Sequence, residues 1–307
     1  TLDDKNGNLS NSFVGISNMP DKTGAVAVGY RKVLTARFDD AKFYWDTDLK
    51  IPLADRADAD LKGIVFQKDL GTVADKMQRV QSVISSLAPS LTGLNITDAQ
   101  RVARLAKGDL SAGVVREFPE LQGIMGGYYA EKDGEKSNVV EAVKVQYENN
   151  DFSNMNMESL AFILADRLDT LVGFFGINQS PTGSKDPFAL RRAALSIIRL
   201  VRQNNIRLNL TPVLESVYNN YQGKLSVSCD DTVRSVLEFF MTRLQVALKE
   251  DGVSHDLVTA VFAKGSDDIV DLINRAKALQ DFMDGMGGDE LYEVFKRASN
   301  IVGNSDT

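Results

Sequence analysis

Apolar residues recur along most of this chain with the three- and four-residue spacing of amphipathic helices. In residues 26–46 the apolar positions are Val26, Tyr30, Val33, Leu34, Phe38, Ala41 and Tyr44 or Trp45. In residues 230–249 they are Val233, Val236, Leu237, Phe240, Leu244 and Leu248. Positions with this spacing lie on one face of a helix, so the pattern predicts a long helix over each segment.

Shorter helices are predicted between and after these two segments. Thr72 and Asp75 have the form of a capping box, and the helix that they open should run to about Leu87, before Pro89. Turn residues separate the remaining periodic segments. These are residues 98–107, 110–117, 119–131, 138–148, 158–175, 212–221, 255–263, 267–284 and 288–302.

Strand signals are confined to the beginning of the chain. Asn6-Gly7 is typical of a hairpin turn, and residues 13–16 are predicted to form the strand after it, whereas the strand before the turn is nearly absent. The sequence therefore predicts a mainly α, multi-helical fold with a remnant β-hairpin at the N-terminus. Because the chain begins without Met, we expect it to be an internal piece of a longer protein.

A tight loop that opens into a helix is predicted at residues 181–203. Pro181 and Gly183 favour turns, and Asp186 is the expected N-cap, with Pro187 at the first helical position. The stripe predicted to face the core is Leu190, Ala194, Ile197 and Val201. The face predicted to be polar and basic carries Arg192, Ser196, Arg199 and Gln203.

The same region is basic within an acidic chain. Residues 180–210 contain six basic side chains and one acid, which sum to +5, whereas the whole chain carries −7 and the remainder therefore −12. A loop at a helix N-terminus with basic side chains nearby is suited to an anion such as a phosphate. In the alternative interpretation, each arginine pairs with an acid elsewhere in the chain.

Composition opposes several other kinds of function. The 43% apolar and 25% charged residues argue against a disordered chain, and no apolar run is long enough for a membrane span, so we expect a soluble, cytoplasmic protein. A single histidine, His255, and a single cysteine, Cys229, argue against a catalytic triad, a disulfide and a multi-residue metal site. No Gly-rich nucleotide loop is present, since Gly123, Gly126 and Gly127 are expected in a helix where small residues permit close packing.

Four stretches resemble the beta subunit of bacterial-type, two-subunit glycyl-tRNA synthetase, in the order expected for that family. They are residues 33–45 (VLTARFDDAKFYW), 65–76 (VFQKDLGTVADK), 116–133 (REFPELQGIMGGYYAEKD) and 181–195 (PTGSKDPFALRRAAL). The last is the most specific, and the resemblance covers nearly all of the 307 residues. Gln146 stands where the family usually has histidine, and Ser196 where it usually has glycine.

The resemblance implies three regions: residues 1–95, the end of an upstream β-containing region with connecting helices; 96–205, an HD-like helical domain; and 206–307, a helical connector leading to an anticodon-binding domain that this chain lacks. The acids of the HD-like region are Asp109, Asp166 and Asp169, without the histidines that hydrolytic metal chemistry would need. We expect Asp166 and Asp169, three residues apart on one helical face, to pair with Lys185, Arg191 or Arg192. The expected result is a structural charge cluster of Asp109, Asp166, Asp169 and Arg191 without a metal.

The resemblance also implies a function in translation. The chain is expected to support tRNA(Gly) binding and assembly with the alpha subunit, in a tetramer of two alpha and two beta subunits. The alpha subunit would use ATP and Mg²⁺, so neither catalytic residues nor a cofactor are expected here. The candidate RNA contacts are Lys185, Arg192, Arg199 and Arg202.

Two other functions remain open. The first is a metal-dependent phosphohydrolase of the HD type, which the scarcity of histidine opposes. The second is a helical scaffold without RNA contact, which the basic region at residues 180–210 opposes.

Overall fold

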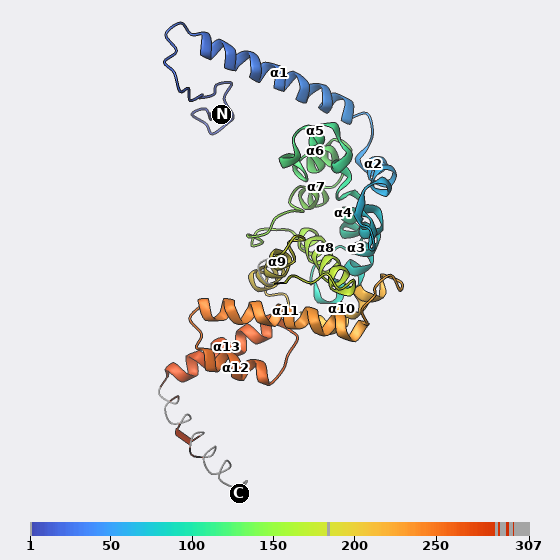
Figure 1. Cartoon of the computed structure of the whole chain (residues 1–307), viewed down its shortest axis with the longest axis vertical. Helices are drawn as coiled ribbons and strands as arrows, with labels where there is room; N and C mark the ends of the chain where they lie inside the picture. The colour runs from blue at the N-terminus through green and yellow to red at the C-terminus, as the bar shows by residue number, and fades with distance from the viewer. Residues whose placement is uncertain (1, 183–184, 286–287, 289–292, 295–296, 298–307) are drawn as a thin grey trace.

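The computed structural model describes all residues except 1, 183–184, 286–287, 289–292, 295–296 and 298–307. The chain forms an elongated assembly of helices and is mainly α, as predicted (Figure 1). Helix α1 (Ala25–Asp48) projects from one end, and α12 (His255–Ala263) and α13 (Ile269–Asp284) lie toward the other. The helix predicted at 288–302 falls largely outside the described residues.

The helices between these ends build the main core. They are α2 (Leu53–Asp60), α3 (Val73–Leu87), α4 (Ile96–Leu105), α5 (Gly113–Glu117), α6 (Ile124–Lys132), α7 (Ser137–Lys144), α8 (Met157–Gly176), α9 (Leu190–Gln203), α10 (Leu210–Asn219) and α11 (Cys229–Glu250). Short 3₁₀ turns lie at Leu61–Gly63, Ala88–Ser90, Gly108–Ser111 and Pro119–Leu121. Helix α8 is buried on nearly every side because α3, α4, α7, α9, α10 and α11 all pack on it.

The predicted capping box is present at the start of α3. Thr72 Oγ1 accepts a hydrogen bond from the Asp75 amide at 3.1 Å, and Asp75 Oδ2 accepts one from the Thr72 amide at 2.8 Å. The strands β1 (Val65–Gln67) and β2 (Gly71–Thr72), which the pattern did not predict, form an antiparallel pair just before this helix.

The N-terminal hairpin was predicted incorrectly in part. An isolated antiparallel bridge joins Asp3 and Leu9 across the Asn6-Gly7 turn, and Gly7 has the positive φ of 79° that the turn requires. Residues 13–16, however, do not form a strand. Ile16 is 90% exposed, so neither a ladder nor a core stabilises an extended strand there.

Helix α1 confirms the predicted helix but buries only one end of its apolar stripe. Trp45 stacks on Tyr129 of α6, with ring centroids 5.4 Å apart. Tyr30, Val33 and Phe38 remain 42%, 65% and 60% exposed because this part of α1 extends beyond the body (Figure 1). The spacing identified the helix without identifying what covers it.

Helix α9 begins three residues later than predicted. Its N-cap is Ala189, in the left-handed region with φ of 54°, and not Asp186. Asp186 still caps the helix from outside, since its carboxylate accepts hydrogen bonds from the Leu190 and Arg191 amides at 2.8 and 2.9 Å. The predicted core stripe is buried, but so is Ser196, because α9 packs against both α8 and α11.

Candidate functional site

The exposed cations of α9 lie where the helical spacing placed them. Arg192 and Arg199 are both exposed, and Lys185 is exposed in the loop before the helix. The Arg199 Nη1 donates to Asn150 Oδ1 at 2.9 Å, in the segment before α8. Arg199 follows Arg192 by seven positions, so their Cα atoms are about 10 Å apart along the helix axis.

Two other arginines of the basic region pair with the acidic C-terminal part of the chain. Arg202 Nη2 lies 2.6 Å from Asp251 Oδ2. Arg207 contacts Asp268 at 2.6 Å and Asp271 at 3.3 Å. Arg202 and Arg207 therefore pair with acids of the same chain, as the alternative interpretation of the basic region expects.

The remaining arginine of the basic region, Arg191, is half-buried. Its Nη1 lies 3.5 Å from the Lys185 carbonyl oxygen, and across the α9–α11 contact it repels Arg243. The Arg243 guanidinium packs over the Phe239 ring, 3.2 Å from the centroid. Burial lowers the pKa of Arg243, and the positive charge of Arg191 lowers it further.

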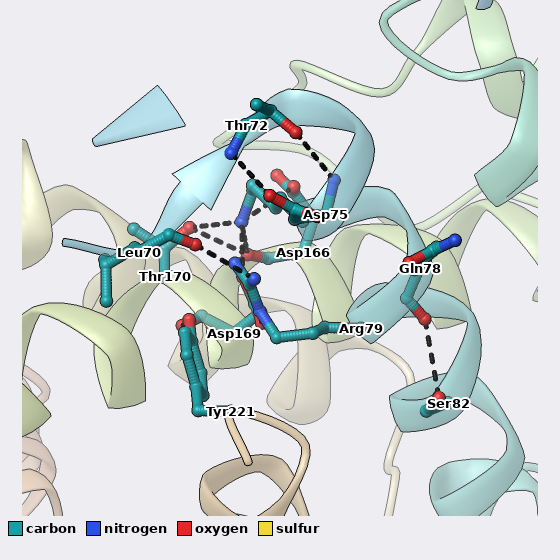
Figure 2. Close-up of polar contacts among 11 residues, drawn as sticks. Leu70, Thr72, Asp75, Gln78, Arg79, Ser82, Asp166, Asp169, Thr170 and Tyr221 are labelled. Atoms are coloured by element: carbon teal, nitrogen blue, oxygen red, sulfur yellow. Dashed lines mark hydrogen bonds and ion pairs between the residues drawn. The ribbon is translucent and has the colours of Figure 1, made fainter. Parts of the chain in front are cut away.

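A second set of charged groups, the buried charge cluster, consists of Lys76, Arg79, Lys107, Asp166 and Asp169. Asp169 has no exposed surface, and Arg79 contacts both of its carboxylate oxygens (Figure 2). Nε lies 2.7 Å from Oδ1, and Nη2 lies 3.2 Å from Oδ2. The Tyr221 ring lies beneath the guanidinium, and its hydroxyl donates to the Asp169 carbonyl oxygen at 2.7 Å.

Lys76 joins both acids of the buried charge cluster. Its Nζ donates to Asp169 Oδ2 at 3.2 Å, to Thr170 Oγ1 at 2.8 Å and to the Asp166 carbonyl oxygen at 2.9 Å. The Asp166 Oδ1 lies 3.2 Å from the same ammonium, but without hydrogen-bond geometry. This acid is therefore held mainly by charge.

Lys107 lies near the other carboxylate oxygen of Asp166. Its Nζ lies 3.9 Å from Asp166 Oδ2 and 3.7 Å from the centroid of the Tyr147 ring. Burial lowers the pKa of Lys107 to about 8. Burial alone would raise the pKa of Asp166, but Lys107 and Lys76 lower it to about 2.

Asp109 has a different role from the one predicted. Its Oδ2 accepts hydrogen bonds from the amides of Gly123 and Gly126 at 2.5 and 3.0 Å, at the start of α6. Burial raises the pKa of Asp109, while these two hydrogen bonds oppose the rise. Asp109 thus anchors α6, and no ion pair of this acid with Arg191 occurs among the described contacts.

The partners of Asp166 and Asp169 differ from those expected from the sequence. The contacts come from Lys76 and Arg79 of α3 and from Lys107, in place of Lys185, Arg191 or Arg192. A signal was present in the sequence, since Lys76 stands on the buried stripe that continues through Val80, Val83 and Leu87. A lysine on a core-facing stripe requires a buried acid nearby.

This arrangement leaves little scope for metal chemistry in the part of the chain that the structure describes. Ammonium and guanidinium groups surround the carboxylates of Asp166 and Asp169. No group of three or more metal-ligating His, Cys, Asp or Glu side chains occurs among the described residues. The side chain of His255 is 70% exposed, away from the buried charge cluster.

Comparison with known proteins gives a consistent relationship. The sequence model of the family described as "Glycyl-tRNA synthetase beta subunit" matches residues 1–263. The chain is 44% identical to the glycine–tRNA ligase beta subunit of Phenylobacterium zucineum and 42% identical to that of Rhodospirillum centenum. Each alignment covers 98% of this chain but 43% of the relative, so the chain spans less than half the length of these relatives. In the described residues, every helix is too short or too polar to cross a bilayer.

Proposed function

This chain belongs to the glycyl-tRNA synthetase beta subunit family, and from this premise we propose that it is a tRNA-facing and scaffolding part of a glycine–tRNA ligase. In this proposal it assembles with an alpha subunit, two copies of each, in the cytoplasm. The alpha subunit binds ATP and Mg²⁺ and forms the glycyl-adenylate. The present chain contributes to the binding of tRNA(Gly).

The observation that carries the RNA contact is the exposed basic face of α9. Arg192 and Arg199 both reach solvent on this helix, whereas Arg202 and Arg207 are paired with acids of the same chain. Exposed cations in an otherwise acidic protein attract the phosphates of a nucleic acid. The RNA-contacting set is therefore narrower than the basic region as a whole and consists of Lys185, Arg192 and Arg199.

A salt titration of tRNA affinity tests this contact. We would measure filter binding of tRNA(Gly) to the wild type, Arg192→Gln and Arg199→Gln between about 50 and 200 mM salt. Each lost phosphate contact should reduce the slope of log K against log salt by up to about 0.9, taking duplex DNA as a guide. The loss should be similar for tRNAs of different sequence, because phosphates carry no base identity.

The matched control is Arg31→Gln, which removes an exposed arginine from the projecting helix α1. If Arg192→Gln and Arg199→Gln retain the wild-type slope and fold normally, α9 does not contact RNA. A separate assay addresses catalysis: the isolated chain should show no glycine-dependent ATP–pyrophosphate exchange. Exchange clearly above background would assign adenylation to this chain.

A further inference from the structure

An exposed aromatic ring lies in the loop that leads into α9. Phe188 is 41% exposed, and one side of its ring stacks on Phe174 of α8, with centroids 4.2 Å apart and planes inclined by 27°. The Phe174 ring in turn makes an edge-to-face contact with the Phe66 ring, with centroids 5.8 Å apart. The ring of Phe188 is therefore supported from below by an aromatic stack while part of its surface faces solvent.

A small hollow lies beside this ring. Its volume is about 210 Å³, and its lining includes Pro181, Lys185, Asp186, Pro187, Phe188 and Leu190. The described part of the loop is held in place, because the Lys185 amide donates to the Thr182 carbonyl at 3.0 Å and the Asp186 carboxylate caps α9. The hollow thus combines the partly exposed Phe188 ring with one cation, Lys185, and one carboxylate, Asp186, whose oxygens already accept hydrogen bonds from the α9 amides.

This combination matches the chemistry of an unstacked nucleobase. Proteins recognise single-stranded RNA by stacking its bases on aromatic rings while nearby cations hold the phosphates. Phe188 supplies the ring, and the exposed Lys185 supplies a cation within the same hollow. On α11, which packs against α9, the Arg243 guanidinium lies over the Phe239 ring.

We propose that this hollow binds one unpaired nucleotide of an RNA, with its base stacked on Phe188 and its phosphate beside Lys185. The inference rests on the proposed contact of α9 with RNA, because the hollow opens at the start of that helix. It adds a distinct selectivity. Arg192 and Arg199 would bind paired and unpaired RNA alike, whereas Phe188 would favour RNA that carries an unpaired base.

Two hairpin RNAs with the same duplex test this selectivity, one blunt-ended and one with four unpaired nucleotides at its 3′ end. The wild type should bind the extended RNA more tightly. Phe188→Leu should weaken binding of the extended RNA by about fivefold or more while leaving the blunt RNA unchanged, because a stacked base contributes about 1–3 kcal/mol. Phe188→Tyr should retain the preference.

The matched control is Phe43→Leu, which shortens a phenylalanine on α1 that is more exposed than Phe188 (66% against 41%) and should change neither affinity. Equal binding of the two RNAs by the wild type would overturn the nucleotide site while leaving the phosphate contacts intact. Equal weakening of both RNAs by Phe188→Leu would also overturn it. A different outcome would overturn the proposed contact of α9 with phosphates. In that outcome Arg192→Gln and Arg199→Gln keep the wild-type salt slope, while the wild type still prefers the extended RNA.

A measurement on the wild type alone guards against misfolding of the Phe188 variants. With 2-aminopurine in the unpaired extension, binding should quench the fluorescence as the base stacks on the ring. If the RNA binds but 2-aminopurine is quenched at none of the four positions, base stacking on Phe188 is contradicted. Inorganic phosphate should compete only weakly, because the apolar ring provides much of the affinity.

Discussion

Arg79 of α3 and Asp169 of α8 form a two-point ion pair in the protein interior, with side chains 7% and 0% exposed. Lys76 contacts the same carboxylate and also that of Asp166. Asp169 is therefore the counter-charge of two buried cations, one of which it shares with Asp166. Asp169→Ala should lower the free energy of unfolding by about 3–5 kcal/mol, because it leaves buried cations without their counter-charge. Urea unfolding at pH 7 measures the loss.

The control is Asp58→Ala, since Asp58 pairs with Arg104 on the surface and both side chains are about half exposed. This pair should contribute only about 0–1 kcal/mol. Similar losses in the two variants would show that the ion pair of Asp169 adds little. Stoichiometric Mn, Fe or Zn in the wild type that is lost in Asp169→Ala would reveal a metal site at these acids.

Lys107 should make stability depend on pH in the alkaline range. Its pKa is about 8 in the folded chain against 10.5 for an ordinary lysine. Between these values the unfolded chain holds a proton that the folded chain has lost, so stability rises with pH by up to about 1.4 kcal/mol per unit. Below pH 8 both states are protonated, and the burial penalty is fully present.

Urea unfolding of the wild type and Lys107→Met at pH 7, 8, 9 and 10 checks this dependence. The difference between the two slopes of stability against pH separates the contribution of Lys107 from that of other titrating groups. The charged groups that act on the pKa of Lys107 are Asp109, Asp166, Lys76 and Arg167. Lys76 still faces Asp166 in the variant, so that acid keeps a counter-charge. Parallel pH profiles for the two proteins would contradict a lowered pKa of Lys107.

The sequence predicted those features that depend on local spacing. The helix periods, the Thr72–Asp75 capping box and the outward direction of Arg192 and Arg199 follow from residues a few positions apart. The partners of Asp166 did not follow in the same way, because Lys76 and Lys107 reach it from segments far away in the sequence. Contacts of that kind depend on how helices pack, which periodicity does not determine.

The predicted start of α9 failed for a local reason. Asp186-Pro187 has the composition of a helix start. Ala189, however, takes a left-handed backbone conformation, so the helix begins only at Leu190. An alanine rarely adopts this conformation, so residue type alone could not reveal it. As a result of this conformation, Phe188 belongs to the loop and not to the helix, and its ring stacks on Phe174 beside the hollow.

Arg202 should differ from its neighbours on α9 in its effect on RNA binding. It lies 2.6 Å from Asp251, and the two side chains are 39% and 30% exposed. Arg202→Gln should therefore leave the salt dependence of tRNA binding near that of the wild type and reduce stability by about 0–1 kcal/mol. A slope reduced as much as in Arg192→Gln would show that tRNA displaces Asp251.

Gly173 of α8 should not tolerate a side chain, because Tyr221 packs directly against it. A Cβ at this position would lie 2.3 Å from the Tyr221 hydroxyl oxygen and 3.0 Å from Leu70 Cδ1. Gly173→Ala should lower stability by about 1–3 kcal/mol through overpacking. The control is Gly29→Ala in α1, where a Cβ meets no atom within 4 Å, and where alanine should stabilise the helix by about 0.5–1 kcal/mol.

The double variant Gly173→Ala, Tyr221→Phe locates the origin of that loss. Removing the hydroxyl relieves the closest contact but also removes its hydrogen bond to the Asp169 carbonyl, so Tyr221→Phe alone should be destabilising. If the clash with Tyr221 dominates, the double variant should be more stable than the sum of the two single changes predicts, by about 0.5–3 kcal/mol. Strict additivity in urea unfolding would place the strain elsewhere, with Leu70 as the next contact.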